Sequence, residues 1–341
     1  MKSLFLSLIA MSLHAADDAQ MRNLENRVSA LEQRKNGGGI ILPSAGANLD
    51  DDVGLSLDGE LLIWKAHQTG MNYAQGTTGG ATPTDTNPFL KPNFVFDPGV
   101  RLSAGLRPNH DDWQLDASWT FFYTKAKGRF DDSTVNMVPL FKINNPAPGS
   151  VAHDLSSTWR VNLNIIDLDL SRASFFSKWS SFRPYISIRN VWLHQKYNLA
   201  AVVDTAYRAG NLRSNLWAIG PRVGCELKFG MGEGFYFFNN TSASLLWGYF
   251  KNNQDTVKVA NRGLYIHTST YNFDTSLGLG WDRKIDDNHY RISIRGAWEH
   301  HIFFDTNYFM SSADLASFSS FDQPNGNFTT DGFTFTVRFD F

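Results

Sequence analysis

The sequence holds one cysteine, Cys225, among 341 residues. A single cysteine excludes an internal disulfide framework and a cysteine-rich zinc site. Net charge is nearly absent as well, because 31 Lys and Arg stand against 33 Asp and Glu, which leaves -2. We expect no nucleic-acid partner, since phosphate binding needs a dense basic surface. After residue 16 no apolar run reaches the roughly 18 residues that a transmembrane helix needs.

Aromatic side chains, by contrast, make up 14% of the chain. The mean hydropathy of -0.29 is nevertheless that of a soluble protein. These two observations conflict, so the placement of the apolar residues along the chain carries more information than their number.

The first 16 residues are typical of a secretory signal peptide. Lys2 supplies the positive charge, residues 4–13 supply the apolar stretch, and Ala15 or Ala16 is a small residue at the cleavage point. Residues 17–52 predict a short periplasmic amphipathic helix and a Gly-rich linker, and residues 53–341 follow as one domain. We therefore expect an exported protein that no helix anchors.

Four apolar residues give the predicted helix one stripe, at a spacing of three and four residues. They are Met21, Leu24, Val28 and Leu31. A helix of two heptads is not stable alone, so it either pairs with copies of itself or lies as a solvated amphipathic helix. The acidic run 50–52 is interpreted as a solvated approach to a strand rather than a metal site.

From residue 53 on, apolar and polar side chains alternate with a period of two, which indicates β-strands. In residues 112–124, for example, Trp113 and Tyr123 belong to the apolar set, whereas Gln114 and Asp116 belong to the polar set. The segments exceed the usual strand length of about five or six residues. They are long enough to cross a membrane at a tilt, which takes roughly 9 to 11 residues.

Aromatic pairs supply an independent ruler for the membrane. Trp113 and Tyr123 stand ten positions apart on one face, as do Tyr271 and Trp281. At roughly 3.3 Å per residue and a tilt near 45°, each pair spans about 23 Å along the membrane normal. Outer-membrane barrels carry an apolar band of about 25 Å between two aromatic girdles. The predicted fold is therefore an all-β, transmembrane, antiparallel up-and-down β-barrel in the bacterial outer membrane.

The connections between the predicted strands alternate in length. Short ones fall at 109–111, 173–181, 230–234 and 285–287, and long ones at 67–95, 128–156, 199–213, 251–270 and 306–331. Short periplasmic turns and long extracellular loops are typical of these barrels. We expect about ten strands, or twelve if the long loops hide two more, with both termini periplasmic.

The last strand alternates up to the final residue. Its apolar residues are Phe333, Phe335, Val337, Phe339 and Phe341. We interpret this aromatic end as the signal for the outer-membrane assembly machinery, which is an expected partner beside the outer-membrane lipid.

By the same alternation, charged residues of the strands face the lumen. They are Glu60, Arg101, Arg107, Asp116, Arg183, Arg189, Arg222, Glu226, Lys228, Asp274, Asp282, Arg291, Arg295, Glu299 and Arg338. The positive residues outnumber the negative ones by nine to six, which hints at an anion preference in a conducting lumen. The alternative is that these charges pair across the lumen and fill it, as side chains fill barrels of about eight strands.

The sequence offers no catalytic motif. His300 and His301 are adjacent, so they point to opposite faces of a strand and cannot chelate one ion together. Cys225 falls on the lipid-facing side and is interpreted as an inert apolar residue. We expect no enzyme, no metal and no cofactor.

Several stretches resemble the pore-forming outer-membrane proteins of the Legionella major outer-membrane type, which include the MOMP-like proteins of amoeba-associated chlamydiae. The stretches are residues 24–33, 96–106, 111–120, 159–172 and 183–192, together with the aromatic C-terminus. The resemblance implies an outer-membrane barrel with channel activity. The chain departs from the chlamydial proteins in that Cys225 alone cannot build their cysteine cross-links.

The sequence thus predicts a porin that lets small hydrophilic solutes and ions diffuse through a narrow charged lumen. Two alternatives remain open. The first is a surface adhesin or structural protein whose long loops contact a host. The second is a surface hydrolase at the outer rim, near His67, His153 and His267, for which no partner set is identifiable.

Overall fold

The computed structural model describes most of the predicted barrel. The described residues are 53–77, 89–108, 113–132, 134–141, 151–177, 179–203, 206–255, 264–285, 289–309, 311–312, 321–322 and 326–341. The predicted signal peptide (1–16) and the predicted helix and linker (17–52) lie outside these residues. Within the described part, no helix is long and apolar enough to cross a membrane.

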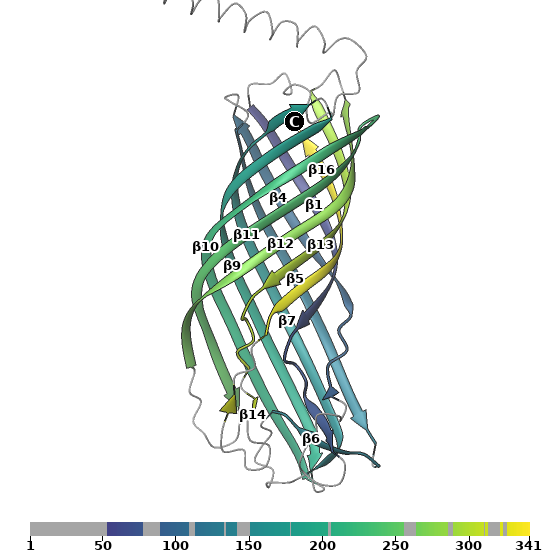
Figure 1. The fold of residues 1–341 in the computed structure, drawn as a ribbon, viewed down its shortest axis with the longest axis vertical. Coiled ribbons are helices and arrows are strands. Elements are labelled where there is room, and N and C mark those ends of the chain that lie inside the picture. Colours follow the sequence, from purple (N-terminus) through teal and green to yellow (C-terminus); the bar gives the residue numbers. More distant parts are fainter. Residues whose placement is uncertain are drawn as a thin grey trace, which may run out of the picture.

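Ten long antiparallel strands form the wall of a closed barrel (Figure 1). They are β1 (Val53–Gln68), β4 (Phe96–Pro108), β5 (Trp113–Asp131), β7 (Ala152–Arg172), β9 (Ser180–Val203), β10 (Ala206–Gly232), β11 (Phe235–Asp255), β12 (Leu264–Ile285), β13 (Tyr290–Phe303) and β16 (Phe328–Asp340). Each pairs with its neighbours in chain order, which confirms the up-and-down barrel and the prediction of ten strands rather than twelve.

The first and last of these strands close the barrel. β1 pairs with β16 from Ser56↔Asp340 to Gln68↔Phe328. Beyond the ladder, the Leu55 and Phe341 amides each donate to the other residue's carbonyl, over 2.6 and 2.8 Å. The residues of the predicted assembly signal alternate outward on β16, and Phe333 is 60% exposed. Their role in assembly stays a prediction.

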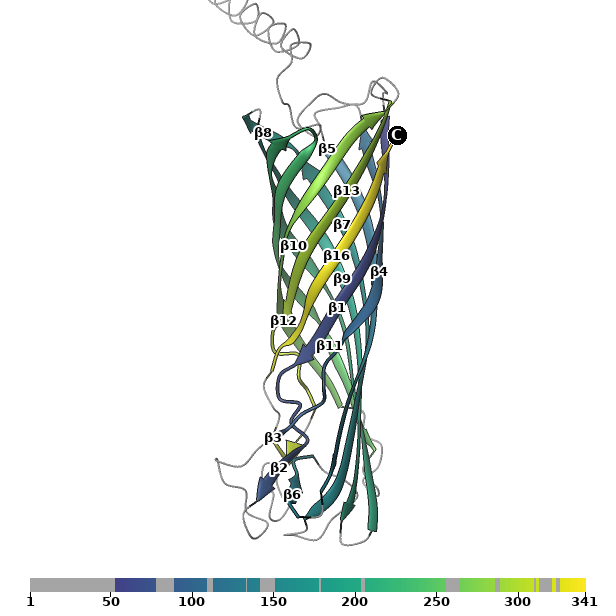
Figure 2. The ribbon, with the colours of Figure 1, turned by 90° about the vertical axis from the view of Figure 1, so that its right-hand side faces the viewer.

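Six short strands lie between the long ones. They are β2 (Ala74–Thr77), β3 (Phe89–Leu90), β6 (Asn136–Pro139), β8 (Ser174–Ser177), β14 (Ser311–Ser312) and β15 (Phe321–Asp322). β2 pairs with β3 on one side and with β6 on the other, at the end of the barrel opposite the C-terminus, as Figure 2 shows.

Two predicted loops are wrong. The connection expected at 251–270 is too long, because β11 continues to Asp255 and β12 already begins at Leu264. Residues 199–213 were expected to form a long connection, but β9 and β10 continue through them and leave only 204–205 between the strands. Alternation persists there, since Leu199, Ala201 and Val203 are buried. The small size of the alanines lowers the contrast between the two faces, which hides the strand in a sequence pattern. The glycine-rich turn is as predicted, with Glu233 and Gly234 at φ of 52° and 87°.

The outer face of the barrel is apolar over a limited height. Leu57, Leu61 and Leu277 are each about half exposed, as are many other apolar residues on the same face. The strands differ in length, from 13 residues in β4 to 27 in β10. A crossing takes roughly 9 to 11 residues, so β9 and β10 extend beyond the membrane at the end opposite the C-terminus.

The division of the outer face into an apolar band and the strand ends beyond it predicts where an outward charge is tolerated. Leu277→Arg lies between Tyr271 and Trp281 on the outer face of β12, so it should cost about 2–4 kcal/mol of stability in a bilayer. Ser269→Arg lies on the same face beyond Tyr271 and should cost less than about 1 kcal/mol. Urea unfolding in lipid vesicles measures both, and equal losses would contradict the placement of the membrane.

Candidate functional site

The lumen at the end that carries the C-terminus is lined by charged side chains. All of the residues predicted to face inward lie on the inner wall. They are Glu60, Arg101, Arg107, Asp116, Arg183, Arg189, Arg222, Glu226, Lys228, Asp274, Asp282, Arg291, Arg295, Glu299 and Arg338. Their position on the wall does not test whether a pore passes between them.

Sequence reasoning missed further charged residues on this wall. They include Asp58, Asp167, Asp169, Lys284, His301 and Asp340. Each stands two positions from another inward-facing charged residue, so strict alternation would have found them all. With these residues the wall holds ten carboxylates against ten Arg and Lys, and His301 in addition. The predicted excess of positive charge is therefore absent from the described wall, which removes the argument for an anion preference.

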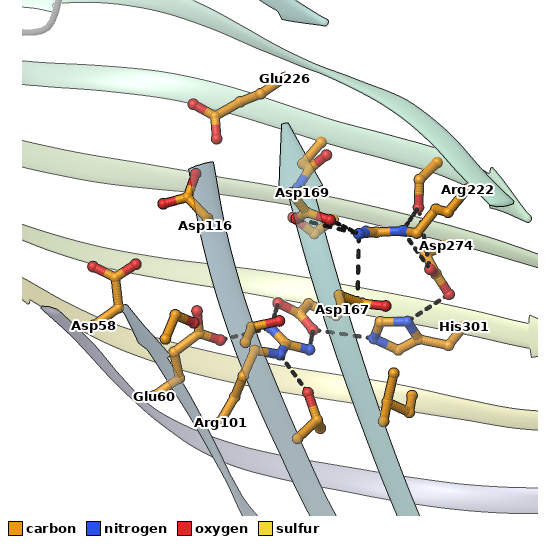
Figure 3. A pocket seen from close by; sticks show the side chains of 18 of the residues that line it. Asp58, Glu60, Arg101, Asp116, Asp167, Asp169, Arg222, Glu226, Asp274 and His301 are labelled. Atoms are coloured by element: carbon orange, nitrogen blue, oxygen red, sulfur yellow. Dashed lines mark hydrogen bonds and ion pairs between the residues drawn. The ribbon is translucent and has the colours of Figure 1, made fainter. Parts of the chain in front are cut away.

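Arg101 and His301 form the part of the network nearest the middle of the barrel. Arg101 pairs with Glu60 at 2.6 Å and with Glu299 at 3.0 Å. The His301 ring joins Glu299 through Nε2 at 3.1 Å and Asp274 through Nδ1 at 2.8 Å, as Figure 3 shows in part. Four strands are thereby linked across the lumen by charge-assisted hydrogen bonds, which are stronger than neutral ones.

Arg189 and Arg222 hold a second set of carboxylates. Arg189 donates to Asp167 through Nε at 2.7 Å and through its second terminal nitrogen at 2.8 Å, and it also pairs with Asp274. Arg222 contacts Asp169 at 3.2 Å. The Arg189 side chain is only 4% exposed. A buried charge is tolerated only when it is paired, so these contacts are a condition of folding.

The third set lies toward the chain ends. Glu226 forms ion pairs with Arg183 and with Lys228, each at 3.0 Å. Arg338 pairs with Asp58 at 3.3 Å and with Asp340 at 2.9 Å. Positive and negative side chains alternate around the wall, so the charges neutralise one another across the lumen instead of forming a ring of one sign.

A cavity of about 170 Å³ remains among these side chains. Eight carboxylates and six arginines line it, together with His301 and hydroxyl and amide groups. Asp58, Asp116 and Glu226 point into it from one end (Figure 3). Among the described residues, no group of His, Cys, Asp and Glu has the arrangement of a metal site.

The other half of the lumen is apolar, which the sequence analysis did not anticipate. Trp159, Tyr197 and Phe250 point inward from the strands and are fully buried. Residues from the connections pack against them, including Phe141 at 5.3 Å and Phe309 at 5.9 Å from the Tyr197 ring centroid. We call this buried cluster the apolar plug. It lies in the lumen between the charged half and the end where the long connections lie.

Trp64 lies at the boundary between the charged network and the apolar plug. Its ring contacts Phe122 in the plug, at 5.7 Å between centroids. On the other side Arg101 lies 5.4 Å from the ring centroid, and the His301 ring lies at 4.7 Å. The indole nitrogen donates to Thr334 at 3.1 Å. One side chain thus joins both halves of the interior.

A closed antiparallel barrel with an apolar outer face and a charged interior defines an integral outer-membrane β-barrel protein. The family model described as Legionella pneumophila major outer membrane protein precursor matches residues 51–341. The chain belongs to this family, which confirms the resemblance in the sequence and places the protein in the bacterial outer membrane.

Outside this family, the chain is similar to solved structures at low sequence identity. No curated protein matches the chain. Among solved structures, the outer membrane protease OmpT from Escherichia coli is 9% identical, with a TM-score of 0.39, and the match covers 87% of this chain and 98% of that one. A Pseudomonas aeruginosa FadL homologue is 8% identical, with a TM-score of 0.27 and coverage of 85% and 90%. The Pseudomonas putida toluene transporter TodX is 10% identical, with a TM-score of 0.27 and coverage of 85% and 89%.

The ion-pair network predicts a large difference between buried and exposed arginines. Arg189→Gln leaves Asp167 and Asp274 without their main partner and should destabilise the barrel by about 3–5 kcal/mol. Arg129→Gln breaks the pair with Asp131, in which the arginine is 70% exposed, and should leave stability nearly unchanged. Urea unfolding followed by tryptophan fluorescence compares the two variants. A similar loss for both would show that the inner network does not stabilise the barrel.

Proposed function

We propose that the protein is an outer-membrane channel through which small hydrophilic solutes and ions diffuse passively, and that the described state is its closed state. The observation that carries this proposal is the charged wall around a cavity at membrane depth. The polar and charged side chains of such a wall can replace part of the hydration shell of a small polar solute or ion. No step of this process needs a nucleophile, a metal or a cofactor.

The proposed gate is the apolar plug. Hydrophobic constrictions stop ions because they exclude water. The plug contains residues from connections, among them Met71 and Phe309, whose packing can change without breaking the barrel wall. Tyr197 fixes one of these connections, since its hydroxyl donates to the Met71 carbonyl at 3.0 Å. Opening would require the connection residues to leave the lumen.

We propose further that both termini are periplasmic. Support comes from the connections, since Glu233 and Gly234 alone join β10 to β11 at the end that carries the C-terminus. Short turns are typical of the periplasmic side. The apolar plug and the longer connections then face the cell exterior. Self-association through Met21, Leu24, Val28 and Leu31, and recognition of the C-terminal strand by the assembly machinery, remain proposals from the sequence.

A second candidate is a structural or adhesive surface protein. The observation in its favour is the apolar plug itself. A lumen that side chains fill can hold the loops in place, but it offers no path to ions. The two candidates make opposite predictions in a planar bilayer, where only the channel gives stepwise currents.

The conductance test uses wild type and a plug variant. Wild type should give rare openings, and Phe141→Ala with Phe309→Ala should increase the open probability at least tenfold, because two buried rings leave the plug. Phe333→Ala is the matched control, since it removes an outward ring from the same barrel. Silence of wild type and plug variant, with folded barrels shown by gel mobility, would exclude the channel and favour the structural role.

Ion selectivity is expected to be weak, with a slight preference for cations, because the cavity holds more carboxylates than arginines. Asp116 accepts a hydrogen bond from Gln114 and has no ion pair among the described residues. Asp116→Asn should therefore shift the reversal potential in a salt gradient toward anions. Asp131→Asn, at an exposed position on the outer surface, should not. A clear anion preference of wild type would contradict this account of the lumen.

A further inference from the structure

The outer face of the barrel carries a row of cations beyond its apolar band. Lys125 on β5 lies opposite Arg160 on β7, Arg160 lies opposite Lys196 on β9, and Lys196 lies opposite Arg213 on β10. All four alternate outward, and Lys196 and Arg213 are exposed. We call these four residues the basic row.

Like charges directly opposite each other in a sheet are destabilising. Within the described part of the chain, none of the four residues pairs with a carboxylate. The acidic side chains on the outer face of these strands are Asp131 and Asp154, near the far end of β5 and β7, and Asp131 is paired with Arg129. Three consecutive repulsive pairs, with no counter-charge among the residues that the structure describes, therefore favour an anion from outside the chain.

The position of the row identifies the kind of anion. Tyr123 is two residues before Lys125 on the outer face of β5 and is 44% exposed. On β10, Trp217 follows Arg213 by four residues and packs on Tyr249 at 5.7 Å. These aromatic residues mark the border of the apolar band, so the basic row lies where lipid headgroups begin.

The dimensions and the chemistry also fit a headgroup. Neighbouring strands are about 4.8 Å apart, so the row spans roughly 15 Å, which a disaccharide with a phosphate at each end can bridge. Arginine binds phosphate with two parallel hydrogen bonds, and lysine binds it as a point charge. Lys127 and Lys251 lie beside the row on the same face and extend it.

We propose that the basic row binds the phosphate groups of a glycolipid in the outer leaflet, of the bisphosphorylated lipid A class. The inference rests on the orientation proposed above, which puts this end of the barrel at the cell surface. It does not depend on whether the lumen conducts, so silence in a bilayer leaves it standing.

The test compares the double variant Arg160→Gln, Lys196→Gln with a matched control. The control, Arg172→Gln with Arg283→Gln, removes two outward cations at the opposite end of the barrel. Purified barrels in neutral nanodiscs are titrated with bisphosphorylated lipid A, with dephosphorylated lipid A and with inorganic phosphate. Wild type and control should bind bisphosphorylated lipid A at least tenfold more tightly than the row variant does. The difference should shrink in high salt, because exposed charges are screened.

A second measurement separates binding from folding. In neutral detergent, the row variant should unfold at the same temperature as wild type or higher, because repulsion between opposed cations is relieved. Added lipid A should raise the unfolding temperature of wild type more than that of the variant. Equal binding of dephosphorylated lipid A, equal binding by the row variant, or binding of inorganic phosphate as tight as that of the lipid would each overturn the proposal.

Discussion

The structure depends on one constraint, which is that hydrocarbon offers no hydrogen-bond partner to a backbone amide or carbonyl. A sheet in a membrane therefore has to close, and β16 closes it by pairing with β1 along the length of both strands. Closure fixes the direction of every side chain in the wall, since alternate residues point to lipid and to the lumen. The charged interior is a consequence, because it receives the residues that lipid excludes.

Closure also brings charges from strands far apart in the sequence within bonding distance. Asp274 of β12 meets Arg189 of β9 and His301 of β13, and Arg101 of β4 meets Glu299 of β13. These side chains are buried, except that Arg101 is 18% exposed, so each partner offsets a loss of hydration. The network holds the wall from inside and at the same time surrounds the cavity, so residues that stabilise the barrel also set the field that a passing ion would meet.

Alternation in the sequence was enough to predict the closed barrel, its ten strands and the inward parity of Arg101 or Glu226. It could not predict the apolar plug, because a period of two separates two faces without saying which one meets lipid. Trp159 and Leu163 are apolar and face inward, although Leu168 and Leu170 on the same strand face outward. The residues of the connections in the plug, such as Phe309, carry no periodic signal at all. The pairing of charges also escaped prediction, since it depends on which strands meet across the lumen.

The two halves of the barrel are inverted with respect to each other. In the membrane half, Leu277 faces out and Asp274 faces in; in the other half, Lys196 faces out and Tyr197 faces in. A strand such as β9 therefore changes the polarity of both faces along its length. We infer that the solvent outside the strand changes from lipid to water at the same point. The inversion explains how a chain rich in aromatic residues has the mean hydropathy of a soluble protein. It also locates the membrane boundary near Trp64, where the charged interior ends and the apolar interior begins.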